Sequence, residues 1–222
     1  MCGGPHLDPE VPDPDRILDA VLRSGNPNRP EASGLGSTYS RALRKDGRVP
    51  ANLVGDRLPF VHLHVSKEEL DPFIRRTHMQ RELLTLRIEG GETIKVLPQE
   101  FQYVDRINYE PIHITFRRWP RDPVSNPVKL RVPIIFLNEG VVPAVKNGGY
   151  VHDMWIEGGL PCLVRDPEHI PRFIIADMKR HTDGDLFFSD LEMPPGVTVQ
   201  STPRTRENKG NFLVGRAKRI RG

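Results

Sequence analysis

The sequence predicts a mainly β protein, with an N-terminal antiparallel β-barrel that carries one or two short helices and a second β-rich domain. Three observations support this class. The chain has 22 prolines in 222 residues, well above the average of roughly 5%. Apolar and polar residues alternate along many short segments, which is the period of a half-buried strand. Glycine and proline pairs that favour turns separate these segments.

Residues 31–118 contain the segments expected to form the barrel. Strands are predicted, in chain order, at 51–54, 60–65, 83–88, 93–97, 99–104 and 111–116. Gly90-Gly91 predicts the turn of a hairpin. Ser66 followed by Glu69 is a capping box that predicts a helix through Ile74. Several short strands with few helices predict a closed or nearly closed barrel.

Residues 1–30 are predicted to be an N-terminal extension with one short amphipathic helix. Asp13-Pro14-Asp15 supplies a cap, a proline at the first helical position and an acid in the first turn. The apolar residues that follow at helical spacing are Ile17, Leu18, Val21 and Leu22. Ser24-Gly25 would end this helix.

The remaining chain is predicted to form a second domain and a tail. Residues 117–127 contain three prolines and are expected to link the domains. The second domain, 119–200, is predicted to be mostly β, with strands within 128–136, 150–156, 161–164, 173–176, 186–188 and 197–199. No helical period longer than a turn or two occurs in it. Residues 201–222 are predicted to be a basic tail.

Basic residues between 41 and 48 form the first candidate site. They are Arg41, Arg44, Lys45 and Arg48. In a helical turn the first three would share one face, and Asp46-Gly47 with Val49-Pro50 ends the turn. Guanidinium groups held rigidly against a sheet suit phosphate contact. The alternative is a solvated basic loop.

The tail is the second candidate site. Its basic residues are Arg204, Arg206, Lys209, Arg216, Lys218, Arg219 and Arg221. Against Glu207 alone they give the tail a net charge of +6, so a chain of net charge +3 carries −3 elsewhere. Such an arm is a common RNA-binding extension. The alternative is a tail that only keeps the protein in solution.

The motifs of common enzymes are missing from the sequence. It contains no phosphate-binding glycine loop, G-x-S-x-G, H-E-x-x-H or C-x-x-C. His62-x-His64 could begin a metal site, but no further ligand is near in sequence, and two surface histidines are the simpler interpretation. We therefore expect no enzyme, no cofactor, no metal site and no small-molecule substrate.

Cysteine and hydropathy patterns bear on the compartment. Cys2 and Cys162 lie far apart, so no disulfide and a reducing compartment are expected. The sequence contains no window of 18 or more apolar residues, so we expect no membrane span. The first residues resemble neither a secretory signal nor a typical transit peptide.

Several motifs in order resemble one known family. Residues 41–55, with RALR, GRVPA and Gly55, resemble the opening signature of the large-subunit ribosomal protein twenty-five family, which includes the CTC general stress protein. Residues 94–102 and 109–116 resemble its central and last barrel strands. The resemblance extends through the second half to about residue 200.

The resemblance implies a barrel that binds 5S rRNA and a second domain that reaches toward neighbouring large-subunit ribosomal proteins. Carried over to this sequence, the RNA-binding residues are Ser40, Arg41 and Arg44 in the basic turn and Gln99, Gln102 and His113 on the barrel. Val54 stands where the family commonly has Tyr, and Thr115 where it often has an acid. The extended termini suggest a mitochondrial ribosome, whose barrel could bind another rRNA segment. The alternative compartment is the bacterial cytoplasm.

The sequence therefore predicts a structural constituent of the large ribosomal subunit that binds rRNA. Two alternatives stay open, a protein-interaction adaptor and a free RNA-binding stress factor with the same barrel.

Overall fold

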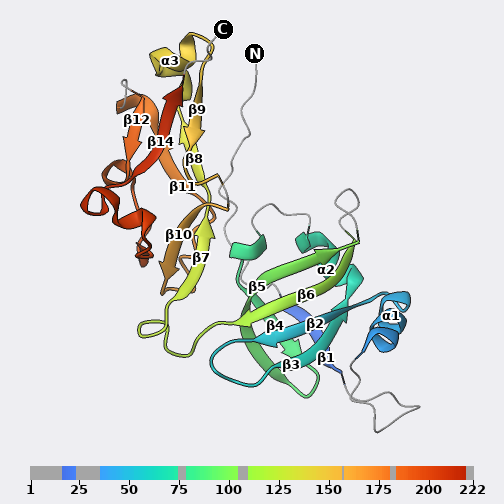
Figure 1. The fold of residues 1–222 in the computed structure, drawn as a ribbon. Coiled ribbons are helices and arrows are strands. Elements are labelled where there is room, and N and C mark those ends of the chain that lie inside the picture. The colour runs from blue at the N-terminus through green and yellow to red at the C-terminus, as the bar shows by residue number, and fades with distance from the viewer. Residues whose placement is uncertain are drawn as a thin grey trace. The chain divides into compact units, whose positions relative to one another are not determined.

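The computed structural model describes residues 17–23, 36–74, 79–104, 110–156, 158–180 and 184–218. The chain divides into two compact units, the first ending at Trp119 and the second beginning at Pro120. Strands predominate in both units (Figure 1), which confirms the mainly β class. Within the described residues, no helix has the length and apolar character that a membrane span needs.

Six strands close the barrel of the first unit in the order β1-β3-β2-β6-β5-β4 (Figure 1). They are β1 (Ile17–Leu22), β2 (Arg48–Val54), β3 (Val61–Ser66), β4 (Leu84–Ile88), β5 (Glu92–Tyr103) and β6 (Pro111–Arg118). Four neighbouring pairs are antiparallel, and the pairs β1–β4 and β2–β6 are parallel. The helical segments are α1 (Ser37–Lys45), α2 (Lys67–Ile74) and the 3-10 turn η1 (Met79–Arg81).

Inward-pointing apolar side chains fill the barrel. The fully buried ones include Leu18, Leu53, Leu63, Leu86, Ile114 and Phe116. Along β2 and β6 these residues alternate with more exposed ones, as the sequence pattern predicted. Closure of the sheet gives each of the six described strands a paired neighbour on both sides.

The prediction of a helix at 17–22 is wrong, because this segment is β1. Leu18 and Ala20 are buried while Ile17 and Asp19 are exposed, which is the period of a strand. The apolar residues of this segment satisfy both periods, so the pattern alone could not decide. Pairing decides it, since β1 covers the otherwise open edges of β3 and β4.

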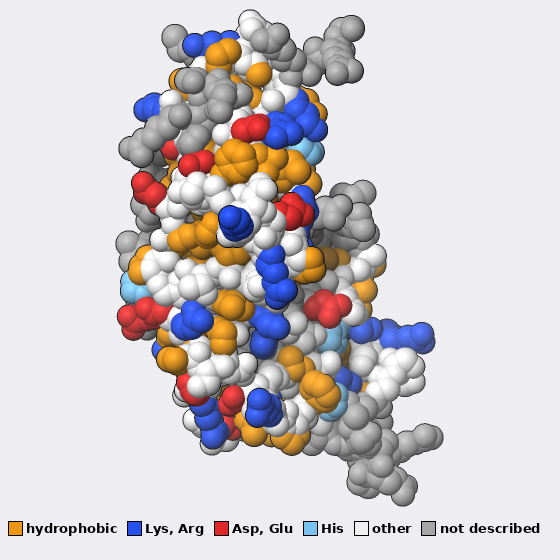
Figure 2. All heavy atoms as spheres, turned by 60° about the vertical axis from the view of Figure 1, so that its left-hand side comes forward, with side chains coloured by type: hydrophobic (Ala, Val, Ile, Leu, Met, Phe, Trp, Pro, Cys, Tyr) orange, Lys and Arg blue, Asp and Glu red, His pale blue; other side chains and the backbone are white. Residues whose placement is uncertain are grey.

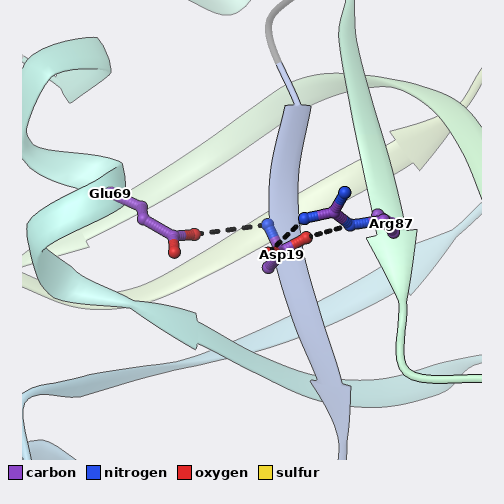
Figure 3. A network of polar contacts seen from close by, with 3 residues as sticks. All are labelled: Asp19, Glu69 and Arg87. Carbon is purple, nitrogen blue, oxygen red and sulfur yellow. Dashed lines mark hydrogen bonds and ion pairs between the residues drawn. The ribbon is translucent and has the colours of Figure 1, made fainter.

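A polar network holds β1 against its neighbours (Figure 3). Arg87 of β4 donates from Nε and Nη2 to the two carboxylate oxygens of Asp19, each at 2.6 Å. The backbone N–H of Asp19 donates to Glu69 Oε2 of α2 at 3.3 Å. This strand, the adjacent strand and the helix are therefore joined at one residue.

Three small sheets make up the second unit. Their orders are β13-β10-β7, β11-β8 and β12-β14-β9. The strands are β7 (Val128–Val132), β8 (Ile134–Leu137), β9 (Tyr150–Asp153), β10 (Leu160–Val164), β11 (Ile174–Asp177), β12 (Asp185–Phe187), β13 (Val197–Val199) and β14 (Leu213–Lys218). The helical segments are α3 (Pro143–Lys146) and the 3-10 turns η2 (Glu139–Val141), η3 (Met178–Arg180), η4 (Phe188–Asp190) and η5 (Arg204–Gly210).

The prediction of a separate tail is also wrong for the described residues 201–218. β14 is the central strand between β12 and β9. Phe212 and Val214 are buried, and Phe212 stacks on Phe188 with ring centroids 5.0 Å apart. Gly215 permits the Phe136 ring to approach, since an added Cβ would lie 2.5 Å from Cε1. The high charge of the segment concealed this short apolar run.

Candidate nucleic-acid interface

Helix α1 presents the basic residues of the first candidate site. Arg41, Arg44 and Lys45 are exposed, while Leu43 is the buried residue that anchors the helix. Arg44 Nε donates to the carbonyl oxygen of Ile112 at 3.0 Å, which ties the helix to the start of β6. The predicted basic helical turn is thus present, and one of its guanidinium groups is held against the barrel.

Arg23, at the end of β1, adds a cation beside α1. Its Nη2 donates to Ser40 Oγ at 3.1 Å, and its guanidinium lies 5.3 Å from the centroid of the Tyr39 ring. Burial lowers the pKa of Arg23, and the positive charge of Arg44 acts in the same direction. Ser40, a predicted RNA contact, therefore lies beside the positive charge of Arg23 as well as the basic residues of its own helix.

A polar row crosses four adjacent strands. Strand register pairs Asn52 of β2 with His62 of β3 on one side and with Thr115 of β6 on the other, and Thr115 pairs with Glu100 of β5. The His62 Nδ1 and Asn52 Oδ1 atoms are 2.8 Å apart. Side chains of paired residues lie on the same face of a sheet. This row therefore offers hydrogen-bonding groups on the outside of the barrel.

His113 and Gln102 are paired across β6 and β5. The pKa of His113 is lowered, first because partial burial disfavours the charged ring and then because Arg23, Arg44 and His62 repel it, although Glu100 opposes them. His113 therefore lies close enough to Arg23 and Arg44 to feel their positive charge. Gln99 is exposed at a bulge where the register shifts between Pro98 and Glu100.

The interpretation of both β3 histidines as surface residues is wrong for His64. Its side chain is only 7% exposed, and its Nδ1 lies 3.2 Å from Nη1 of Arg48, the last residue of the predicted basic group. Burial lowers the pKa of His64, and Arg48 and Arg23 add repulsion. Among the described residues, no three His, Cys, Asp or Glu side chains are grouped as metal ligands would be.

The basic residues predicted at the C-terminal end belong to the second unit. Arg216 donates from Nε and Nη2 to the Asp185 carboxylate at 2.7 and 2.8 Å. Arg206 Nε donates to Ser201 Oγ at 2.7 Å, while Lys209 and Lys218 are exposed. Arg204 packs on Trp155. Arg219 and Arg221 lie outside the described residues.

Figure 2 shows basic side chains spread among acidic and hydrophobic ones on the face in view, so charge alone marks no site there.

Sequence reasoning missed Arg23, Asn52 and His62 as members of the barrel group. The alternation of His62 along its strand was visible in the sequence. The strand order that puts β3 beside β2, and β2 beside β6, was not visible, because it depends on distant pairing. Arg23 was missed because β1 was interpreted as a helix.

Together these residues form the barrel face, which we define by Arg23, Ser40, Arg41, Arg44, Lys45, Arg48, Asn52, His62, Gln102 and His113. It combines exposed and partly fixed guanidinium groups with neutral donors and acceptors. Guanidinium groups match phosphate oxygens, and imidazole and amide groups can bind base edges or 2′-hydroxyls.

Comparisons with known proteins show the family of this chain. Residues 28–116 match the model of the Ribosomal L25p family, which covers α1 and the strands from β2 into β6. A protein named large ribosomal subunit protein bL25 from Novosphingobium aromaticivorans is 32% identical over 76% of this chain and 79% of its own length. The chain belongs to this family.

Two further members are similar over more residues than the first unit contains. The bL25 proteins of Bartonella bacilliformis and Bordetella parapertussis are 32% and 30% identical, over 74% and 78% of this chain and 77% and 83% of their own lengths. Family membership confirms the resemblance drawn from the motifs. The family model begins after β1, so this strand lies outside the region that the model matches.

Proposed function

We propose that this protein is a structural constituent of the large ribosomal subunit and binds rRNA through the barrel face. The relatives are named as large-subunit ribosomal proteins, and family membership supports the same role here. The observation that carries rRNA binding is the grouping of Arg23, Arg44 and His113 from three separate elements on one side of the barrel.

The arrangement suits an RNA backbone beside a shallow groove. Arg41, Arg44, Lys45 and Arg48 supply cations for phosphates, which position a protein on nucleic acid without reading sequence. Gln102, Asn52 and His113 offer donors and acceptors of the kind that bind base edges and 2′-hydroxyls in the wide minor groove of RNA. The proposed partner is 5S rRNA or the large-subunit rRNA segment that replaces it, together with neighbouring ribosomal proteins.

The compartment follows from the ribosome that contains the protein. The mitochondrial matrix stays our proposal, and the bacterial cytoplasm is the alternative that the bacterial relatives favour. Crosslinking within purified large subunits would decide which rRNA contacts residues 41–48 and 99–113.

Salt-dependent binding to an rRNA fragment tests the barrel face. Arg41→Ala and Arg44→Ala should each weaken binding and reduce the slope of log K against log salt by about 0.9, the value for one phosphate contact on a duplex. Lys95→Ala is the matched control, because Lys95 is an exposed cation of the same unit outside the barrel face.

Equal effects of all three substitutions would contradict this site. Affinity that does not depend on salt would favour the adaptor alternative instead. Sedimentation away from large subunits would favour the free stress factor.

A further inference from the structure

A cleft in the second unit gathers charge that the barrel face does not explain. It has a volume of about 760 Å³ and is lined in part by Lys129, Arg131, Arg204, Asp153, Trp155 and Ile156. Three of these side chains are cations and one is a carboxylate. Lys129 and Arg131 are both exposed and lie two residues apart on β7, so they point to the same side of the strand.

Arg204 is held flat at this cleft. Its guanidinium carbon lies 4.5 Å from the centroid of the Trp155 ring, and its Nη2 donates to the carbonyl oxygen of Met154. Trp155 is itself fixed, because it is only 8% exposed and packs edge-on against Phe212 with ring centroids 5.3 Å apart. A planar cation stacked on one side by an indole can accept a second planar group on its other side.

The other lining groups fit the same kind of ligand. The Asp153 carboxylate accepts the backbone N–H of Trp155 at 2.7 Å, so the acid of the cleft has a structural partner. Ile156 is 74% exposed and offers an apolar surface at the cleft. A strand of RNA would fit this arrangement. Its phosphates would lie beside Lys129 and Arg131, and one of its bases would stack on Arg204.

We propose that this cleft binds a single-stranded segment of RNA, as a second contact that the protein makes independently of the barrel face. The inference rests on the proposed role in rRNA binding and adds a site in the second unit to it. The Trp155–Arg204 pair supplies the stacking platform, and Lys129 and Arg131 bind the backbone.

The test uses the full chain carrying Arg41→Ala and Arg44→Ala, so that the barrel face contributes little. The probes are a labelled uridylate hexanucleotide and an abasic hexanucleotide with the same phosphates, with binding followed by fluorescence anisotropy. The hexanucleotide should bind at least about fivefold more tightly than its abasic counterpart, because stacking adds to the phosphate contacts.

Two variants of this chain then assign the residues. Lys129→Ala with Arg131→Ala should lower the salt slope by about 1.4, since each single-strand phosphate contributes about 0.7. Arg204→Lys keeps the charge but loses the flat stacking surface, and should remove most of the preference for bases. Lys146→Ala, which removes an exposed cation of the same unit outside the cleft, should change neither quantity.

Unchanged hexanucleotide binding in the two cleft variants, or tighter binding of an acidic peptide of equal charge, would overturn this site. Either result leaves the barrel face standing, because its own test is the effect of Arg41→Ala and Arg44→Ala on the rRNA fragment. Conversely, an rRNA fragment indifferent to the barrel substitutions would refute the proposed function whatever the cleft binds.

Discussion

Burial decides the charge of His64 and His113. His64 and His113 both have a pKa below the ordinary value, first because burial disfavours the charged ring and then because arginines surround them. Each ring is therefore neutral at neutral pH and can both donate and accept a hydrogen bond. This leaves the phosphate contacts of the barrel face to its arginines and lysine.

The pH dependence of stability follows from these pKa values. A histidine whose folded pKa lies below its unfolded value contributes stability that is present above the unfolded value, about 6.5, and is lost as the pH falls toward the folded pKa. We therefore expect the free energy of unfolding of the RNA-free protein to fall between pH 7.5 and 5.5. Chemical denaturation at several pH values measures it.

His113→Gln is the variant for this test, since it keeps the polar group but cannot titrate. It should reduce the loss of unfolding free energy over the same pH interval, because burial lowers the pKa of His113 in the folded protein. A pH dependence identical in wild type and His113→Gln would contradict the role assigned to burial. RNA phosphates would favour the charged ring, so affinity for RNA should change in the opposite direction and rise as the pH falls.

A second prediction at this scale concerns the glycine pair before β10. Gly158 and Gly159 both have positive φ, at 86° and 90°. A Cβ on Gly159 would lie 2.4 Å from the backbone of Val132, while one on Gly158 would meet the Arg131 side chain at 3.2 Å. A flexible side chain can move and a strand backbone cannot.

Gly159→Ala should therefore cost about 3 kcal/mol or more of unfolding free energy. Gly158→Ala should cost about 1–2 kcal/mol, since it carries the backbone strain without the backbone clash. Denaturant titration of the two variants compares them directly. Equal costs would mean that strain alone explains both positions.

At the scale of elements, β1 shows how a barrel can impose a strand on an ambiguous pattern. Leu18 is fully buried in the core and Leu22 is 46% exposed. A helical stripe would bury both residues, so the two structures predict different costs for the same substitution.

We expect Leu18→Ala to lower the free energy of unfolding by about 2–5 kcal/mol, as for a filled core position. Leu22→Ala should cost much less, because its side chain keeps contact with water. Thermal unfolding of both variants provides the measurement. Similar losses for the two leucines would support a helix rather than β1.

The elements that the sequence predicted correctly are those with local signals. Gly90-Gly91 turns between β4 and β5, and the alternation around Leu63 marks β3. The basic turn at 41–48 was found because Arg41, Arg44 and Lys45 follow one another at helical spacing. Strand order could not be found this way, so the neighbours of Asn52 and the position of Arg23 required the structure.

The same limit explains the error at the C-terminal end. Charge dominates residues 204–221, and a single apolar run around Phe212 and Val214 gave no period to measure. The structure shows that this run leads into the central strand of a sheet, because β14 pairs with β12 and β9 and the side chains of Phe212 and Val214 are buried. The net charge of a segment bears on its solubility and on the partners it attracts. It does not exclude that single residues of the segment lie in the core.

At the scale of the whole molecule, each unit has a core of its own. The barrel core contains residues of the first unit alone, from Leu18 to Phe116. The second unit buries Leu160, Cys162 and Val214. The two units are therefore expected to respond separately to a change that removes part of one core.

A chain ending at Gln200 would test whether the C-terminal residues are structural. Loss of β14 removes the central strand of one sheet together with Phe212, the partner of Trp155 and Phe188. We expect the second unit to lose its cooperative unfolding transition while the barrel keeps its own. A dispensable tail would leave both transitions unchanged.

Cys162 provides the site-specific measurement. It is fully buried on β10, and burial raises the pKa of its thiol to about 12. In a Cys2→Ser background it should therefore resist thiol reagents at pH 8 in the full chain and react readily in the shortened one. Binding of the rRNA fragment should persist in the shortened chain, because the barrel face is intact. Continued protection of Cys162 would instead show that the second unit folds without β14.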